Sequence, residues 1–139
     1  MRVFPDTNVL ASAFGTRGLC ADVLRIILAE HEFITGEVII DELRAVLRKK
    51  FGVPAATVKE IENFLRGYHV EPKPRELLNW KLSDRNAVMV VGSAVKAKAA
   101  ILVTGDQAML DLVDKPEGLR IVNPREFWNL AAGKQERKD

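Results

Sequence analysis

Short apolar runs alternate along the chain with longer stretches in which apolar residues recur every three or four positions. The short runs have the length of strands, and the longer stretches have the period of amphipathic helices. In the stretch 37–51, Ile39, Ile40, Leu43, Val46 and Leu47 form one apolar stripe. The pattern predicts strands at 2–4, 32–35, 100–103 and 119–122. It predicts helices at 21–30, 37–51, 54–68, 83–98, 107–113 and 124–131.

The alternation of strands with helices is typical of βαβ units and of an α/β fold with a mainly parallel sheet. The segment 69–81 contains Pro72 and Pro74, so we expect it to be mostly loop, with a weak strand at its start. Pro5 should be the last residue of its strand, because proline cannot donate a hydrogen bond within a central ladder. No linker or repeat divides the chain. We expect a single domain over 1–132 and a polar, frayed tail over 133–139.

Composition narrows the class of protein further. The 139 residues are 47% hydrophobic and 29% charged, as in an ordinary globular domain. Asp6 interrupts the N-terminus before the apolar segment of a secretory signal, and no apolar run reaches the ~18 residues of a membrane span. The single cysteine, Cys20, indicates a reducing compartment, so we expect a cytoplasmic protein. The net charge of +2 is compatible with a nucleic-acid partner without requiring one.

Two aspartates closely follow predicted strands. Asp6 comes after the strand 2–4, and Asp106 comes after the strand 100–103. The carboxyl ends of parallel strands meet at one edge of a sheet, which is where such sheets carry their functional sites. We therefore expect both side chains at this edge. Each also has a structural interpretation, because aspartate is a favoured N-cap and a helix follows both.

Two further acids lie on predicted helices. Glu42 flanks the apolar stripe of 37–51, so it should lie beside the core and not point directly away from it. Asp84 lies on the apolar axis near the start of 83–98, after the predicted N-cap Ser83. Either acid could instead be purely structural, Glu42 as a solvated helix residue and Asp84 as a first-turn acid that complements the helix dipole.

Carboxylates that converge in a protein repel one another unless a cation neutralises them. Mg²⁺ and Mn²⁺ prefer oxygen ligands, so a set of aspartates and glutamates is the donor set that they need. His31 and His69 have no paired spacing of the kind that zinc sites show, so zinc is not expected. The acids therefore predict a Mg²⁺ or Mn²⁺ site.

Three motifs occur in order along the chain. They are Asp-Thr-Asn-Val-Leu at 6–10, Asp-Glu-Leu at 41–43 on a helix, and Thr-Gly-Asp at 104–106 after a strand. This set resembles the PIN-domain family over nearly the whole chain, and within it the toxin-like (VapC-like) branch of toxin–antitoxin systems. The resemblance implies a three-layer α/β/α fold with a central, mainly parallel sheet of four or five strands. It also implies a metal-dependent endoribonuclease that hydrolyses RNA.

The resemblance also assigns roles to residues of all three motifs. It implies that Asp6, Glu42 and Asp106 bind Mg²⁺ or Mn²⁺, and that Asn8 and Thr104 orient the carboxylates or the attacking water. An RNA substrate, an antitoxin protein that covers the acidic pocket and a homodimer are implied as partners.

At the position of the family's fourth acid, this chain departs from the pattern. This position falls on Ala87, one turn after Asp84. Asp84 could replace it as a catalytic and metal-binding acid through a longer reach or a water, or the site has lost a ligand. The second alternative predicts a degenerate PIN scaffold that binds RNA or a protein partner without catalysis.

A rival from another class is a phospho-receiver domain, which also places acids at strand ends. Such a domain needs a lysine after a late strand, and this chain has none at either late strand. For the RNA-binding surface, the sequence offers Arg17, Arg44, Lys49 and Arg85 as cations around the acidic pocket, although a solvated surface charge is an alternative for each.

Overall fold

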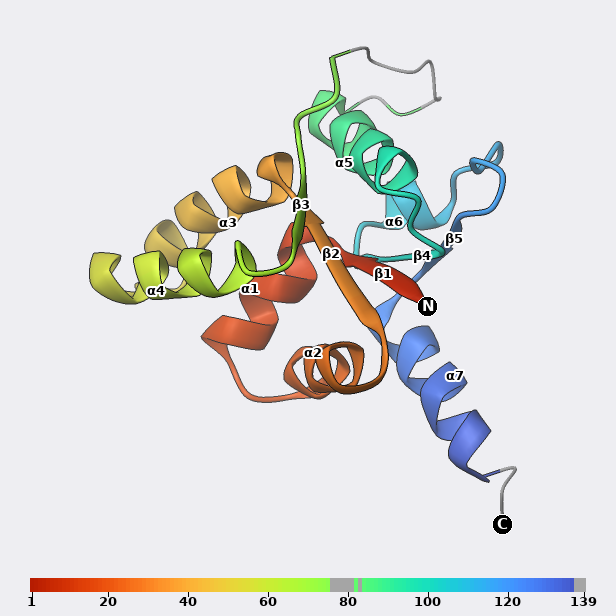
Figure 1. Cartoon of the computed structure of the whole chain (residues 1–139), viewed down its shortest axis with the longest axis horizontal. Helices are drawn as coiled ribbons and strands as arrows, with labels where there is room; N and C mark the ends of the chain where they lie inside the picture. The colour runs from red at the N-terminus through yellow and green to blue at the C-terminus, as the bar shows by residue number, and fades with distance from the viewer. Residues whose placement is uncertain (76–81, 83, 137–139) are drawn as a thin grey trace.

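A five-stranded parallel sheet forms the centre of the computed structural model (Figure 1). The structure describes residues 1–75, 82 and 84–136, with side chains described as far as Ala132. The strands are β1 (Arg2–Pro5), β2 (Glu32–Gly36), β3 (His69–Glu71), β4 (Ile101–Val103) and β5 (Arg120–Val122). The helices are α1 (Thr7–Gly15), α2 (Leu19–Glu30), α3 (Glu37–Lys49), α4 (Ala55–Leu65), α5 (Arg85–Lys96), α6 (Gln107–Leu110) and α7 (Pro124–Glu136).

The strand order is β3-β2-β1-β4-β5, and all neighbouring strands are parallel. From β1 the chain moves outward to β2 and β3, and it then returns to the other side of β1 to form β4 and β5. The direction of travel therefore reverses between β1 and β4. In open parallel sheets, ligands bind in the crevice outside the carboxyl ends of the strands at such a reversal. The predicted α/β fold with a parallel sheet is confirmed.

β1 lies in the middle of the sheet although it ends in a proline. Pro5 pairs with Val103 as the last residue of the strand, which is the position where the missing N–H does least harm. The next residue, Asp6, donates its N–H to the carbonyl of Val103 at 2.8 Å. The ladder between β1 and β4 thus continues past the proline and brings Asp6 to the carboxyl edge.

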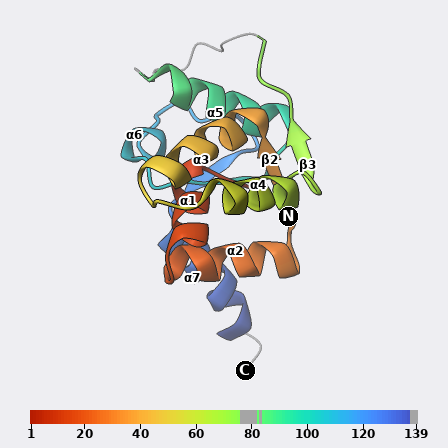
Figure 2. The same ribbon diagram turned by 90° about the vertical axis from the view of Figure 1, so that its left-hand side faces the viewer.

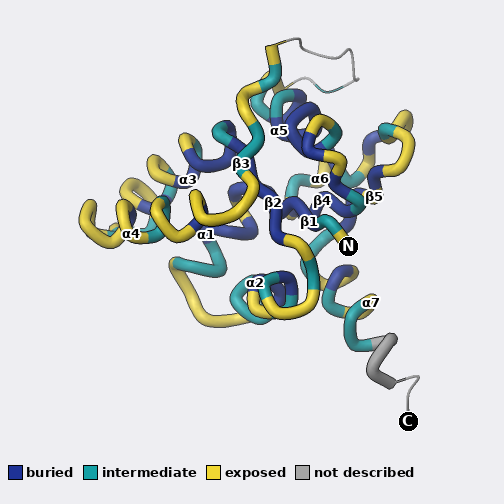
Figure 3. Tube along the Cα trace, in the orientation of Figure 1, coloured by how far each residue is buried: buried dark blue, intermediate teal, exposed yellow. Residues whose placement is uncertain are grey.

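Helices cover both faces of the sheet. In two views at right angles, α5 lies on one side of the strands, and α2 and α7 lie together on the other (Figures 1 and 2). The central strands β2, β1 and β4 are mostly buried, whereas β3 at the edge of the sheet is not (Figure 3). Val3, Phe4, Ile34 and Leu102, each 0% exposed, come from three neighbouring strands. Burial of each such side chain stabilises the fold by about 1.5–3 kcal/mol, so the sheet is a rigid base for its edge.

The helix boundaries differ from the prediction in several places. Helix α1 begins directly after Asp6. The prediction gave no range for this helix and stated only that a helix follows Asp6. Helix α6 ends at Leu110, well before 113, and the apolar Val113 is 90% exposed. Helix α7 continues beyond Ala131 to Glu136, into the segment predicted as a tail. These differences arise at helix ends, where apolar periodicity carries the least information.

The start of α5 also corrects the prediction. Its N-cap is Asp84, whose carboxylate accepts the N–H of Asn86, and not Ser83. Ser83 itself lies outside the described residues, as do 76–81 of the predicted loop and 137–139 of the predicted tail. In the part of the chain that the structure describes, no helix has the length and apolar character needed to cross a membrane.

Candidate functional site

Asp6 lies at the reversal point of the sheet, and its side chain is only 4% exposed. One carboxylate oxygen, Oδ1, accepts the N–H of Thr7 at 2.7 Å, and Oδ2 accepts the hydroxyl of Thr104 at 2.7 Å. The Thr104 hydroxyl in turn accepts the N–H of Asp106 at 3.0 Å. A single buried hydroxyl therefore links the acid after β1 to the backbone of the acid after β4.

A second bridge joins the same two strand ends. The Nδ2 of Asn8 donates to Oδ2 of Asp6 at 3.3 Å, and the Oδ1 of Asn8 accepts the N–H of Gly105 at 3.1 Å. Asn8 and Thr104 are the two residues predicted as supporting polar groups. Both contact Asp6, so its carboxylate has a defined orientation.

The pKa of Asp6 is raised from 3.8 to about 6. Burial is the largest cause, and the negative charges of Glu42 and Asp106 add to it, while the hydrogen bonds from Thr104 and Thr7 act in the opposite direction. Glu42 and Asp106, both remote from Asp6 in sequence, are therefore close enough to oppose the ionisation of Asp6. A cation at this point would relieve that repulsion.

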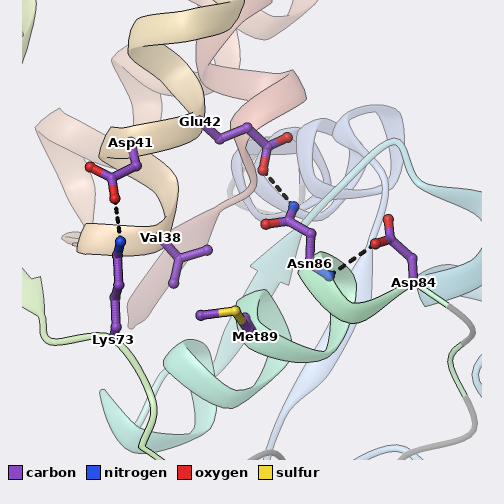
Figure 4. A pocket seen from close by; sticks show the side chains of 7 residues that line it. All are labelled: Val38, Asp41, Glu42, Lys73, Asp84, Asn86 and Met89. Carbon is purple, nitrogen blue, oxygen red and sulfur yellow. Dashed lines mark hydrogen bonds and ion pairs between the residues drawn. The ribbon is translucent and has the colours of Figure 1, made fainter.

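Glu42 reaches the site from α3 and is half-buried, as its position beside the apolar stripe predicted. Its carboxylate accepts a hydrogen bond from Nδ2 of Asn86 on α5. Both residues line a pocket of about 600 Å³ together with Asp41, Lys73 and Asp84 (Figure 4). This pocket, called the acidic pocket below, lies between α3 and the start of α5.

Asp84 is present at the acidic pocket, but as an exposed N-cap and not as a buried acid. Asp6 and Asp106 also cap the helices that follow them. The capping interpretation of Asp6 and Asp106 therefore holds, and Asp84 also has a structural role, but as the N-cap itself and not as the expected first-turn acid. Capping does not compete with a chemical role for Asp6, because among the described residues Oδ1 accepts one hydrogen bond, and a carboxylate oxygen has a second acceptor position that a cation can use.

Ala87, the position that the resemblance aligned with a fourth acid, is 1% exposed and belongs to the hydrophobic core. The residue before it, Asn86, is the one that enters the acidic pocket. Sequence reasoning missed Asn86, and its only signal was an amide two residues after Asp84. The structure thus places an amide, and not an acid, opposite Glu42.

The donor set suits a hard divalent cation, since it consists of carboxylate and amide oxygens. Among the described residues, no three His, Cys, Asp or Glu side chains are grouped closely enough to hold one ion together. Mg²⁺ keeps several waters and is commonly bound through one or two carboxylates. The arrangement therefore fits an ion held directly by one or two of Asp6, Glu42 and Asp106 and by the others through water.

The described lining of the acidic pocket includes none of the predicted cations, which were Arg17, Arg44, Lys49 and Arg85. Arg44 is engaged by Asp41 and also lies 3.3 Å from a carboxylate oxygen of Glu62. The cation among the described lining residues of the acidic pocket is Lys73, whose Nζ lies 2.5 Å from Asp41. This ion pair lowers the pKa of Asp41, chiefly through the hydrogen bond from Lys73.

Comparison with known proteins gives a family match. The family model described as the PIN domain matches residues 2–108. VapBC2 from Rickettsia felis, solved bound to a DNA fragment from its promoter, is similar with a TM-score of 0.63 and 12% identity, over 88% of this chain and 98% of that chain.

A second similar structure is Mycobacterium tuberculosis VapC20, described as a sarcin-ricin loop cleaving toxin. It has a TM-score of 0.58 and 16% identity, over 82% of this chain and 99% of that chain. At these identities the likeness is one of fold. A search of the curated proteins gives no match.

Proposed function

The chain belongs to the PIN-domain family, and from this premise we propose that it is a divalent-metal-dependent endoribonuclease. The observation that carries the proposal is that Glu42 and Asp106 lie close enough to the buried Asp6, at the reversal point of the sheet, for their charges to act on it. Burial is the largest cause of the raised pKa of Asp6, and the negative charges of Glu42 and Asp106 raise it further. A cluster of this kind is costly unless a cation is bound, and perturbed carboxylates in a cleft are typical of functional sites.

In this proposal, Asp6, Glu42 and Asp106 hold Mg²⁺ or Mn²⁺, and Asp84 contributes from the rim of the acidic pocket. When bound, the ion lowers the pKa of a coordinated water and offsets charge on the phosphate. Thr104 and Asn8 hold the carboxylate of Asp6 in one orientation through their hydrogen bonds. Asn86 has the same effect on Glu42.

The likeness to VapBC2 and VapC20 supports a role as the toxin component of a toxin–antitoxin pair. The substrate would then be RNA, and an antitoxin would bind over the acidic pocket. Homodimerisation remains a prediction of the family resemblance. Cytoplasmic localisation remains a prediction from the composition of the chain.

The proposal is tested by RNA cleavage with and without Mn²⁺. The wild-type chain should cut RNA only when the metal is present, and Asp6→Asn should lower the rate by more than about a hundredfold, since even residues that only support a metal site cost about 10–100-fold. The matched control is Asp22→Asn, which changes a partly exposed aspartate of α2 that pairs with Arg25. Metal-dependent cleavage that survives in Asp6→Asn would contradict the assignment.

A second candidate function is a scaffold that binds RNA or a protein without cutting it. The observation that favours it is the pair Asn86 and Ala87, which leaves the start of α5 without an acid beyond Asp84. Calorimetric titration with Mn²⁺ separates the two functions. A nuclease site gives saturable binding that Asp6→Asn abolishes, and a scaffold gives none.

A further inference from the structure

A second groove, of about 740 Å³, lies next to the acidic pocket. One wall is the segment that leaves β3, from Glu71 to Arg75, and the other is the C-terminal half of α5 with Lys96 and Lys98. Figures 1 and 2 show this segment running beside α5. We call this feature the basic groove.

Positive side chains outnumber negative ones along the basic groove. Its described lining includes the cations Lys73, Arg75, Lys96 and Lys98 and a single acid, Glu71. The Glu71 carboxylate lies 2.9 Å from a ring nitrogen of His69. The groove therefore carries positive charge that its own walls do not balance.

Three of these cations are available to a ligand. Arg75, Lys96 and Lys98 are exposed, and within the described residues none of them has a carboxylate partner at ion-pair distance. This separates them from Arg44 and Arg66, whose guanidinium groups are each shared between two acids. Cations that are not held by the protein are the ones that can bind phosphate without first breaking an ion pair.

The basic groove and the acidic pocket meet at one residue. Lys73 lines both, and its ammonium group is paired with Asp41 at the pocket edge. A strand of nucleic acid could therefore pass from the groove to the carboxylates by way of Lys73. Such a path is needed, because the acids alone would repel a polyanion.

We propose that the basic groove binds the phosphodiester backbone of the RNA strand whose scissile phosphate enters the acidic pocket. The inference rests on the proposed function and assigns it a substrate path. Lys96 and Lys98 contact successive phosphates outside the reacting one, and Lys73 lies at the passage to the site. These residues bind substrate and take no part in the chemical step.

The test variant is Lys96→Gln/Lys98→Asn. Asparagine is chosen at the second position because Lys98 has a φ of 58°, a left-handed conformation that asparagine tolerates. The matched control is Arg48→Gln/Lys50→Asn at the end of α3. It also removes two exposed positive charges, with the same spacing, from the C-terminal end of a helix. Any loss of stability that comes from removing positive charge at the negative end of a helix dipole is therefore equal in the groove variant and the control.

Binding of labelled single-stranded RNA is measured by fluorescence anisotropy across roughly 50–200 mM salt, with every chain carrying Asp6→Asn so that the RNA stays intact. Loss of two phosphate contacts should weaken the affinity roughly tenfold and lower the slope of log Kd against log salt by about 1.4. With Asp6 restored, the groove variant should have a raised KM and a kcat near that of the wild type. The control should match the parent in all three measurements.

Equal Kd values and salt slopes in the groove variant and its parent would overturn the proposal. An equal loss in groove variant and control would also overturn it, because the effect would then be one of overall charge. Neither result touches the proposed function, which fails only if the wild-type chain does not cut RNA with metal present. The two failures are thus separate.

Discussion

The side-chain amide of Asn86 on α5 donates a hydrogen bond to the carboxylate of Glu42 on α3, across 44 positions of the sequence. A fourth acid at this point would add to the repulsion around Asp6. The amide group of Asn86 instead donates a hydrogen bond. This bond offsets part of the negative charge of Glu42 and holds the Glu42 carboxylate toward α5. The site therefore has a smaller negative charge than four carboxylates would give it, and its affinity for a cation should be correspondingly lower.

Asn86→Asp should tighten Mn²⁺ binding roughly tenfold, because it adds a charged oxygen ligand beside Glu42. Asn86→Ala removes the same hydrogen bond without adding charge, so it should leave the affinity unchanged or weaker. Isothermal titration calorimetry of both variants measures the difference. If the aspartate and alanine variants bind Mn²⁺ equally, charge at this position does not control the affinity.

Ala87→Asp should destabilise the fold instead of restoring a ligand. Ala87 is 1% exposed in the core, where an unpaired carboxylate costs about 3–5 kcal/mol at neutral pH. Urea unfolding should show a lower free energy of unfolding for Ala87→Asp than for the wild type. The difference should become smaller at acid pH, because the new carboxyl group then takes up a proton. Asn86→Asp, one residue earlier but in the acidic pocket, is the comparison. A stable Ala87→Asp chain with tight Mn²⁺ binding would contradict the placement of these two residues.

The stability of the metal-free protein should depend on pH through Asp6. Its folded pKa of about 6 lies above the ordinary value of 3.8. Between these values the folded chain holds more protons than the unfolded chain, so the free energy of unfolding falls as pH rises, by up to about 3 kcal/mol in all.

Asp6→Asn should remove this dependence. In the presence of a chelator the variant should be more stable than the wild type at pH 8, by about 1–3 kcal/mol, and should lose this advantage near pH 4. Mn²⁺ should then stabilise the wild type but not the variant. Urea unfolding at several pH values measures all three effects. A variant that is less stable than the wild type at every pH would show that burial of the Asp6 carboxylate carries no penalty.

Thr104→Val should be far more disruptive than its similar shape suggests. The buried hydroxyl donates to Asp6 and accepts from the N–H of Asp106, so its loss should cost about 2–4 kcal/mol. Thr104→Ser keeps the hydroxyl and loses only a methyl group, at about 1 kcal/mol. Unfolding measurements at pH 8 compare the two, and RNA cleavage should fall about 10–100-fold in the valine variant alone. Equal stability of valine and serine variants would mean that the hydroxyl has no positioning role.

Much of the fold was predictable because it depends on local patterns. The apolar runs and the helical periods give the element order, and the alternation of strands and helices gives a parallel sheet. The carboxyl edge follows from this, so Asp6 and Asp106 could be placed together without coordinates. Helix ends were less well predicted, since Val113 continues an apolar pattern into a segment that is not helical and is exposed.

The sequence by itself determined the chemistry of the site, because residue types and their positions after strands are local properties. Only the tertiary structure decided which side chains meet. Asn86 and Ala87 are adjacent in the chain, but the angle at which α5 packs on the sheet sends one into the acidic pocket and the other into the core. The same packing sets Lys96 and Lys98 opposite Arg75, which no period in the sequence relates. Helix orientation depends on contacts between segments remote along the chain, and these contacts exist only after the chain has folded.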